Sequence, residues 1–375
     1  MKLVGEHAID AYSVMKIGLI GLNQTGKTSL FELVTGRRDD TPIVGGKEKV
    51  NIGTGIVPDK RVEYLSEMFK PKKTTFAKID FTDVTGLTVS DGQKGSKASK
   101  FLADVRDCDA IVHVLRAFES DAVFHDLDTI DPLRDLELVE GEMLLADLEL
   151  IEKRIERIKA GKKVSAEQQK EIDLLTRCFS RLEEVGTIKD IDMSEQEQMI
   201  VKAYALFTDK PRIAVLNVDD TQLDIRSDLT FDNLRQACQR LNFPLVSLCV
   251  SIELEISRLD AEDSKVFMDE LGITQPGIEL LTRSVYERLN LISFFTYGAD
   301  EVKAWTIDKG TPAKKAAGKI HSDIERGFIR AEVVKYDELY ELGSMAKVKE
   351  KGLFRLEGKE YTVLDGDIIT FRFNV

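Results

Sequence analysis

The feature that most constrains the fold is a short glycine-rich motif near the N-terminus. Residues 21–28 are Gly-Leu-Asn-Gln-Thr-Gly-Lys-Thr, which matches the pattern G-x-x-x-x-G-K-[S/T]. An apolar run over residues 16–22 leads into the motif and a helix-forming stretch over residues 27–35 follows it. A loop in this setting points backbone N–H groups and a helix N-terminus at phosphate oxygens. The sequence therefore predicts a triphosphate-binding loop in an α/β domain.

The side chains of the loop have distinct expected contacts. We expect the Lys27 ammonium to reach the β- and γ-phosphate oxygens as a binding and catalytic group, and the Thr28 hydroxyl to hold Mg²⁺. The loop residues that we predict to contact the nucleotide are Gly21, Asn23, Gln24, Thr25, Gly26, Lys27, Thr28 and Ser29.

A second motif, Asp-Val-Thr-Gly over residues 83–86, ends a later apolar run. Alone this pattern is usually a turn, but after a phosphate-binding loop it predicts that Asp83 holds Mg²⁺ and that the Gly86 N–H senses the γ-phosphate. The next residue is Leu87, where many GTPases carry a glutamine that orients water. Because leucine cannot orient water by hydrogen bonding, hydrolysis must use another group or be slow.

A histidine inside a later apolar strand is open to two interpretations. His113 is either a core residue or the group that orients the attacking water in place of the glutamine. We include His113 among the candidate catalytic residues.

The base-binding part of the site is expected at the ends of two further strands. Residues 217–220 are Asn-Val-Asp-Asp and stand where GTPases carry Asn-Lys-x-Asp, whose aspartate accepts hydrogen bonds from guanine. Asp220 keeps the aspartate position, whereas Val218 replaces the lysine. We predict that Asn217, Val218 and Asp220 contact the base and that Ser251 closes its pocket. A polar loop without a ligand is the alternative.

The alternation of strands and helices predicts the architecture. From residue 16 onward it favours a mostly parallel sheet covered on both faces. Within residues 133–203, apolar residues at spacings of 4, 3, 4 and 3 predict an inserted antiparallel coiled-coil hairpin, with two ordinary core helices as the alternative. The predicted domains are an N-terminal extension (1–14), a nucleotide-binding domain in two parts (15–132 and 204–288), the insertion (133–203) and a C-terminal α+β domain (289–375).

Composition limits the compartment and the partners. A net charge of −13 argues against nucleic-acid affinity through bulk attraction, and we expect no DNA partner. The four cysteines are scattered, as in a reduced cytosolic protein. Since no stretch approaches the about 18 apolar residues that span a bilayer, we expect a cytoplasmic chain without a membrane partner. We also expect a monomer.

The order of these motifs resembles the Obg-like ATPase (YchF) family. The resemblance is carried by the phosphate loop, DVTGL, FLADVRDCDAIVHVLRAF, NVDD, EVKAWTIDKGTPAKKAAGKIHSDIERGFIRAEVV and RLEGKEYTVLDGDIITFRFNV. It implies a P-loop nucleoside triphosphatase of the translation-factor class that prefers ATP, binds Mg²⁺ and associates with ribosomes. It also implies that the C-terminal domain is a TGS domain with a ubiquitin-like β-grasp, and that His113 takes part in hydrolysis.

Three departures from the family pattern concern the nucleotide. Asn23 and Gln24 stand where the family has proline and asparagine, so the resemblance does not carry over potassium stimulation. The family's magnesium-binding switch threonine aligns near Lys47. The base-reading motif ends in Asp220 where the family usually has glutamate. We favour ATP, with GTP or dual use left open.

These observations favour an ATP-hydrolysing regulator that contacts the large ribosomal subunit through the coiled coil and the TGS domain. In this hypothesis, nucleotide orders the segments at residues 45–51 and 86–97. One alternative is a nucleotide-binding interaction module with negligible hydrolysis, and another is a GTP-specific switch.

Overall fold

The computed structural model describes residues 15–36, 51–84, 87, 102, 104–125, 127–222 and 231–374. Within these residues the chain forms two compact units. One contains Lys16–Thr54 and Asp80–Ser284, and we call it the P-loop unit. The other contains Gly55–Ile79 and Val285–Val375, and we call it the C-terminal unit. The predicted extension at residues 1–14, Lys47, Gly86 and most of the two segments expected to respond to nucleotide lie outside the described residues.

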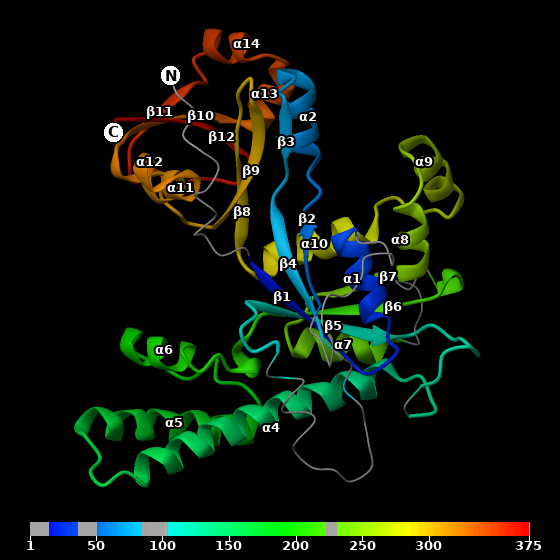
Figure 1. The fold of residues 1–375 in the computed structure, drawn as a ribbon, viewed down its shortest axis with the longest axis vertical. Coiled ribbons are helices and arrows are strands. Elements are labelled where there is room, and N and C mark those ends of the chain that lie inside the picture. Colours follow the sequence, from blue (N-terminus) through cyan, green and yellow to red (C-terminus); the bar gives the residue numbers. More distant parts are fainter. Residues whose placement is uncertain are drawn as a thin grey trace. The chain divides into compact units, whose positions relative to one another are not determined.

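The P-loop unit is built on a sheet with the strand order β2-β4-β1-β5-β6-β7 (Figure 1). Each neighbouring pair from β4 to β7 is parallel. All residues of the central strand β5 are buried, as expected for a parallel sheet covered on both faces. The strands are β1 (Lys16–Ile20), β2 (Asn51–Ile56), β4 (Lys78–Asp83), β5 (Ala110–Arg116), β6 (Arg212–Asn217) and β7 (Leu245–Leu248). The predicted α/β class with a mostly parallel sheet is confirmed.

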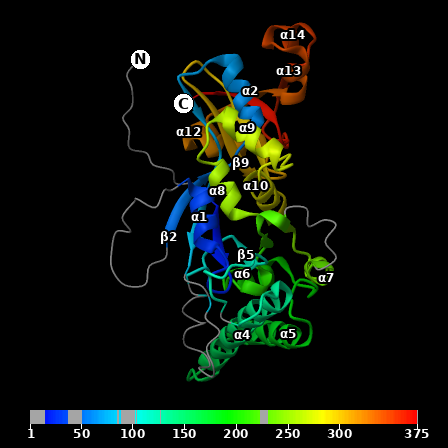
Figure 2. The ribbon, with the colours of Figure 1, turned by 90° about the vertical axis from the view of Figure 1, so that its right-hand side faces the viewer.

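Helices cover both faces of this sheet. Figures 1 and 2 show α4 and α7 on one side of it and α1 and α8 on the other. The buried cores on the α4 side include Leu136, Val139 and Met143 from that helix. The helices are α1 (Lys27–Thr35), α4 (Pro132–Lys159), α7 (Asp232–Arg240), α8 (Val250–Ile256), α9 (Ala261–Glu270) and α10 (Gly277–Arg288), with short 3-10 turns η1 (Phe207–Asp209) and η2 (Asp220–Gln222).

A helical hairpin occupies the region predicted to interrupt the sheet. α4 is followed by α5 (Ala166–Val185), and a capping box formed by Ser165 and Gln168 starts the second helix. Most of the predicted seam residues pack into one cluster. A third helix, α6 (Glu195–Lys202), was not predicted, and Val201 and Leu206 from this part of the chain join the same cluster. The core of the hairpin is therefore shared with a further segment, while its description as a coiled coil stays a prediction.

The C-terminal unit contains a second sheet with the strand order β11-β10-β12-β8-β9-β3. β8 and β9 are antiparallel, as are β10 and both of its neighbours, whereas β12 and β8 are parallel. Its strands are β3 (Lys73–Thr75), β8 (Leu291–Thr296), β9 (Glu301–Asp308), β10 (Phe328–Lys335), β11 (Arg355–Glu357) and β12 (Asp367–Phe373). Its helices are α2 (Lys60–Phe69), α11 (Ala313–Ile320), α12 (Ser322–Arg326), α13 (Tyr336–Leu342) and α14 (Met345–Glu350).

The C-terminal unit also takes in Gly55–Ile79, which the sequence analysis had placed in the nucleotide-binding domain. β3 pairs in parallel with β9, from Lys73 opposite Glu301 onward. The Arg61 guanidinium of α2 lies over the Phe295 ring at 4.9 Å. The predicted domain limits therefore differ here from the observed packing, because a short edge strand and one amphipathic helix join a sheet far away in the sequence.

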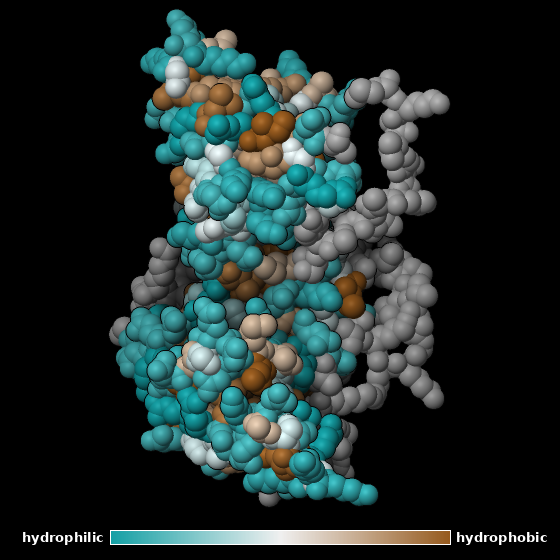
Figure 3. All heavy atoms as spheres, turned by 90° about the vertical axis from the view of Figure 1, so that its left-hand side faces the viewer, coloured by the Kyte–Doolittle hydropathy of each residue, from teal (hydrophilic) through white to brown (hydrophobic). Residues whose placement is uncertain are grey.

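The surface and the helices were searched for membrane-spanning features. Among the described residues, no helix has both the length and the apolar character needed to cross a bilayer. On the face drawn in Figure 3, hydrophobic residues occur as separate spots within a mostly hydrophilic surface.

Candidate nucleotide-binding site

The predicted phosphate loop joins β1 to α1 with a backbone that needs glycine at two positions. Gly21 has φ 145° and Gly26 has φ 91°, values that side chains rarely allow. A Cβ atom at Gly21 would collide with the Val114 carbonyl oxygen, and one at Gly26 with the Asn217 side-chain amide. Gln24, exposed at the loop tip, also has positive φ (58°). The motif glycines are thus explained by close packing of the loop against β5 and β6.

The lysine and the hydroxyls of the loop lie around the start of α1. The Lys27 side chain is buried, and its ammonium donates to the Leu22 carbonyl oxygen at 2.5 Å, inside the curve of the loop. The Thr25 hydroxyl donates to the same oxygen at 3.2 Å. Thr28, in the first turn of α1, is exposed, and its neighbour Ser29 is partly buried. The ammonium and the first-turn N–H groups therefore converge on the space at the start of α1.

Asp83 at the end of β4 joins this arrangement. Its Oδ2 accepts a hydrogen bond from the Thr28 hydroxyl at 3.1 Å. Burial raises the pKa of Asp83, while hydrogen bonds from Asn51 and Thr28 and the charge of Lys27 act in the opposite direction. Its other carboxylate oxygen, Oδ1, is buried and has no hydrogen-bond partner among the described residues. An orphaned carboxylate oxygen beside a threonine hydroxyl fits the oxygen ligands that Mg²⁺ prefers.

The described residues contain no group of three or more His, Cys, Asp or Glu that could hold a metal by themselves.

Asn51 is a site residue that sequence reasoning missed. Its side-chain amide, at the start of β2, donates to Asp83 Oδ2 at 3.4 Å. A signal is present in the sequence, because residues 51–53 are Asn-Ile-Gly and match an Asn-x-Gly of the resembled family, but the match alone does not predict a contact with Asp83.

The Asn217 side chain, at the end of β6, holds the phosphate loop in place through two hydrogen bonds, which we call the brace. Its Nδ2 donates to the Thr25 carbonyl oxygen at 3.1 Å, and its Oδ1 accepts from the Val250 N–H at 3.1 Å. The side chain is 5% exposed. A single amide therefore ties the phosphate loop to the first turn of α8.

The other predicted base-contacting residues divide into exposed and buried positions. Asp220 is exposed directly after β6, and Ser251 is exposed in the first turn of α8. Val218 is 2% exposed and packs in the core with Leu216 and Phe231. Its side chain is therefore part of the core, and its contact with the base stays a prediction.

His113 and Leu87 are both enclosed. His113 lies on β5 opposite Ile20 of β1 and is 1% exposed, and neither ring nitrogen has a hydrogen-bond partner among the described residues. Burial, with the charges of Lys27 and Arg212, lowers its pKa to about 3, so the ring is neutral near pH 7. Leu87 pairs with Leu22 and is buried in a hydrophobic cluster.

Comparison with known proteins places this geometry in a family. The family model YchF-GTPase_C, described as a protein of unknown function (DUF933), matches residues 291–374. Proteins named ribosome-binding ATPase YchF are similar over 96% of this chain and 99% of their own length, with 38% identity for Bacillus subtilis and 37% for Haemophilus influenzae. The solved structure of the Schizosaccharomyces pombe YchF GTPase matches 96% of this chain and 97% of its own, with a TM-score of 0.79 and 27% identity. The chain belongs to the YchF family.

Proposed function

We propose that this chain is a Mg²⁺-dependent nucleoside triphosphatase that hydrolyses ATP slowly. The observation that carries the proposal is the convergence of the Lys27 ammonium, the N-terminus of α1 and the Thr28–Asp83 pair at the end of β1. These groups supply positive charge and N–H donors for phosphates, and oxygens for a divalent ion.

The protein groups have separate tasks in phosphoryl transfer. Thr28 and Asp83 would hold Mg²⁺, the latter directly or through water, and the ion would neutralise charge on the β- and γ-phosphates. Lys27 would bind the same phosphate oxygens from the loop side. Asn51 orients the Asp83 carboxylate through the hydrogen bond at 3.4 Å. Because phosphoryl transfer depends mainly on positioning and charge, this arrangement accounts for binding and for a basal rate.

Slow turnover follows from the residue after the second motif. The Leu87 side chain is buried in the core and its N–H donates to the Gly21 carbonyl oxygen at 3.0 Å. It therefore packs beneath the phosphate loop and is no substitute for a glutamine that orients water. His113 remains the proposed substitute, acting as a neutral hydrogen-bonding group, since a ring with a pKa of about 3 is not an imidazolium at pH 7.

A preference for ATP is supported by the base-binding residues. In GTPases the motif lysine accompanies the aspartate that reads guanine, whereas here Val218 is a core residue. Asp220 remains exposed and available to accept a hydrogen bond from either purine. The relatives named ATPase also favour ATP, although one solved relative is titled a GTPase.

Direct titration of the full-length protein with ATP and GTP, in the presence of Mg²⁺, tests these points. We expect tighter binding of ATP, and loss of binding and of phosphate release in Lys27→Ala. Steady-state phosphate release at the same rate in both proteins would contradict hydrolysis and favour an interaction module. Absence of binding for both nucleotides would contradict the whole proposal.

Association with the ribosome is proposed from the names of the relatives, which are called ribosome-binding ATPases. We place this contact on the large subunit, through the helical hairpin and the C-terminal unit, and the chain as a monomer in the cytoplasm. Exposed lysines support both surfaces, with Lys163 at the hairpin turn and Lys314 on α11. Cosedimentation with large subunits is expected to weaken in Lys163→Glu and Lys314→Glu. The matched control Lys265→Glu changes an exposed lysine of similar environment on α9, and an equal effect there would refute specific contact.

A further inference from the structure

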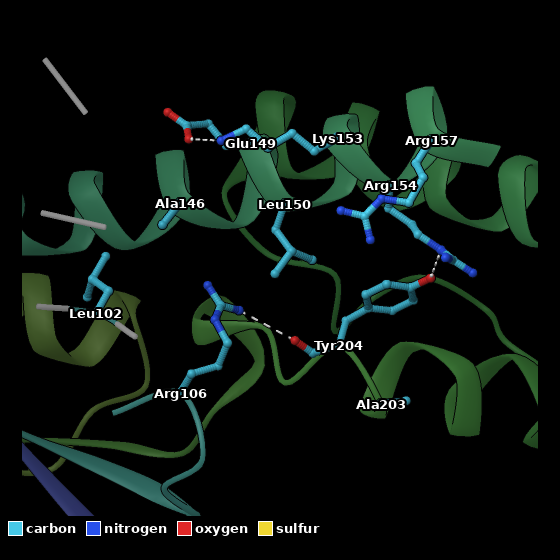
Figure 4. Close-up of a pocket in the computed structure, with 10 residues that line it drawn as sticks. All are labelled: Leu102, Arg106, Ala146, Glu149, Leu150, Lys153, Arg154, Arg157, Ala203 and Tyr204. Carbon is cyan, nitrogen blue, oxygen red and sulfur yellow. Dashed lines mark hydrogen bonds and ion pairs between the residues drawn. The ribbon is translucent and has the colours of Figure 1, made fainter. Parts of the chain in front are cut away.

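A second polar cavity lies in the P-loop unit, away from the phosphate loop. Its volume is about 680 Å³, and α4 forms one wall while Leu102, Arg106 and the chain at Ala203 and Tyr204 form the others (Figure 4). None of the lining residues belongs to the phosphate loop or to the predicted base-binding set. The cavity is therefore separate from the proposed nucleotide site.

Four cations line this cavity. Lys153, Arg154 and Arg157 come from consecutive turns of α4, and Arg106 comes from the segment that precedes β5. One carboxylate lines it, that of Glu149, which pairs with Lys153 at 2.9 Å. Cationic side chains thus outnumber the carboxylate in the lining, in a chain whose net charge is −13.

Two of the cations are held in place by the protein. Arg106 donates to the carbonyl oxygens of Tyr204 and Ala205 at 3.4 and 3.3 Å and forms an ion pair with the buried Asp147 at 3.6 Å. Its guanidinium lies over the Phe207 ring at 4.0 Å. Arg154 binds the Glu171 carboxylate through Nε and Nη2, at 2.8 and 3.2 Å. Each keeps further N–H donors, because a guanidinium has five. Positioned donors lose little conformational freedom on binding an anion.

The other two cations are more open. Lys153 is 69% exposed, and Arg157 is exposed and makes no hydrogen bond or ion pair with the residues that the structure describes. They stand one helical turn apart on the same face of α4. A phosphate group between them would receive charge-assisted hydrogen bonds from both.

The remaining lining is apolar. Leu102, Ala146, Leu150 and Ala203 contribute aliphatic surface, and Tyr204 contributes its ring, whose hydroxyl is already hydrogen-bonded to Arg154 and Glu171. A binding site with apolar walls and a few placed polar groups is typical of small ligands, and cavities of 300–1,000 Å³ are their usual size. A polymer backbone would not need such apolar walls.

We propose that this cavity binds a phosphorylated small molecule with a planar or apolar portion, of the mononucleotide class. The phosphate lies against Arg157 and Lys153, with Arg106 and Arg154 as fixed donors, and the planar portion packs on Tyr204 and Leu150. The site would act in addition to the phosphate loop.

Calorimetry on the full-length protein tests this with AMP and with pyrophosphate as probes. The titration is made with the unmodified protein holding Mg²⁺ and one equivalent of a non-hydrolysable ATP analogue, and again with nucleotide-free Lys27→Ala, so that failure of the phosphate loop does not obscure the second site. We expect one further binding event in both proteins.

The variants Arg157→Gln and Lys153→Gln are each expected to weaken probe binding about tenfold, the loss of one charge-assisted hydrogen bond. The matched control Lys159→Gln removes the same charge from the same helix outside the cavity and should change affinity less than twofold. Far-UV circular dichroism confirms that the variants stay folded. The proposal is overturned if neither probe binds, if Lys159→Gln weakens binding as much as Arg157→Gln, or if a short single-stranded RNA binds with the same arginine dependence while both probes fail.

Discussion

Replacing Asn217 with alanine is the sharpest test of how the phosphate loop is held. The amide donates to the Thr25 carbonyl oxygen and accepts from the Val250 N–H, both at 3.1 Å and both buried. Asn217→Ala leaves these two buried backbone groups without their hydrogen-bond partner. An unsatisfied buried group costs about 1–3 kcal/mol, so the expected loss of unfolding free energy is about 2–6 kcal/mol.

A second substitution separates this brace from the packing around it. A Cβ at Gly26 would collide with the Asn217 amide, and the residue has φ 91°. Gly26→Ala alone suffers both the collision and the backbone strain. In the Asn217→Ala background the collision is absent and only strain of about 1–3 kcal/mol remains. The double variant should therefore be more stable than the sum of the single effects predicts.

Urea unfolding followed by circular dichroism measures these differences, and hydrogen exchange reports the local effect. In Asn217→Ala the Val250 amide should exchange faster than in the unmodified protein. A stability loss below about 0.5 kcal/mol with unchanged exchange at Val250, or additive effects of the two substitutions, would refute the brace.

Three further predictions concern buried groups. Burial lowers the pKa of His113 to about 3, from an ordinary 6.5. Between pH 6.5 and 3 the unfolded chain therefore binds a proton at this residue that the folded chain does not, and the free energy of unfolding falls as the pH drops through this range. Urea unfolding from pH 6.5 to 4 should show a slope steeper by up to about 1.4 kcal/mol per pH unit than in His113→Leu, and equal slopes would contradict this. Leu87→Gln should lower stability by about 1–3 kcal/mol without raising phosphate release, since its side chain is buried; a faster rate would show that it reaches the water. Glu140→Leu leaves the buried Arg212 cation without its carboxylate and should cost about 3–5 kcal/mol, and a loss below 1 kcal/mol in urea unfolding would count against a coupled pair.

Most of the sheet could be predicted from sequence because its strands are buried and strongly apolar. The sequence has apolar runs over residues 16–22, 78–84, 110–118, 212–218 and 244–250. The strands β1, β4, β5, β6 and β7 lie within two residues of these runs at either end. α6 was missed because its sequence shows no clear apolar stripe, with Met199 and Ile200 exposed and Val201 buried. Such a helix is fixed by packing on the hairpin and carries little periodic signal of its own.

The site was predictable where chemistry dictates spacing. The distance between Gly21 and Lys27 in the sequence is imposed by the phosphate-binding geometry, so the loop could be located without a structure. The brace by Asn217 and the hydrogen bond from Asn51 to Asp83 depend on contacts between residues far apart in the sequence. The burial of Val218, the residue after β6, likewise depends on its packing in the core with Phe231. Sequence shows which residues stand at a strand end, whereas the fold decides which of them point inward.

The segment Gly55–Ile79 belongs to the C-terminal unit although the chain on both sides of it belongs to the P-loop unit, and this connection bears on function. The chain leaves the P-loop unit along β2 and returns along β4, and these strands carry Asn51 at the start of one and Asp83 at the end of the other. Within the C-terminal unit, this segment is held by the pairing of β3 with β9 and by the ion pair of Arg61 with Asp365 at 2.7 Å. The two residues that meet at the proposed magnesium site are therefore joined through a segment built into the other unit. The link between the C-terminal unit and the nucleotide site that this connectivity gives is therefore covalent, through the strands β2 and β4.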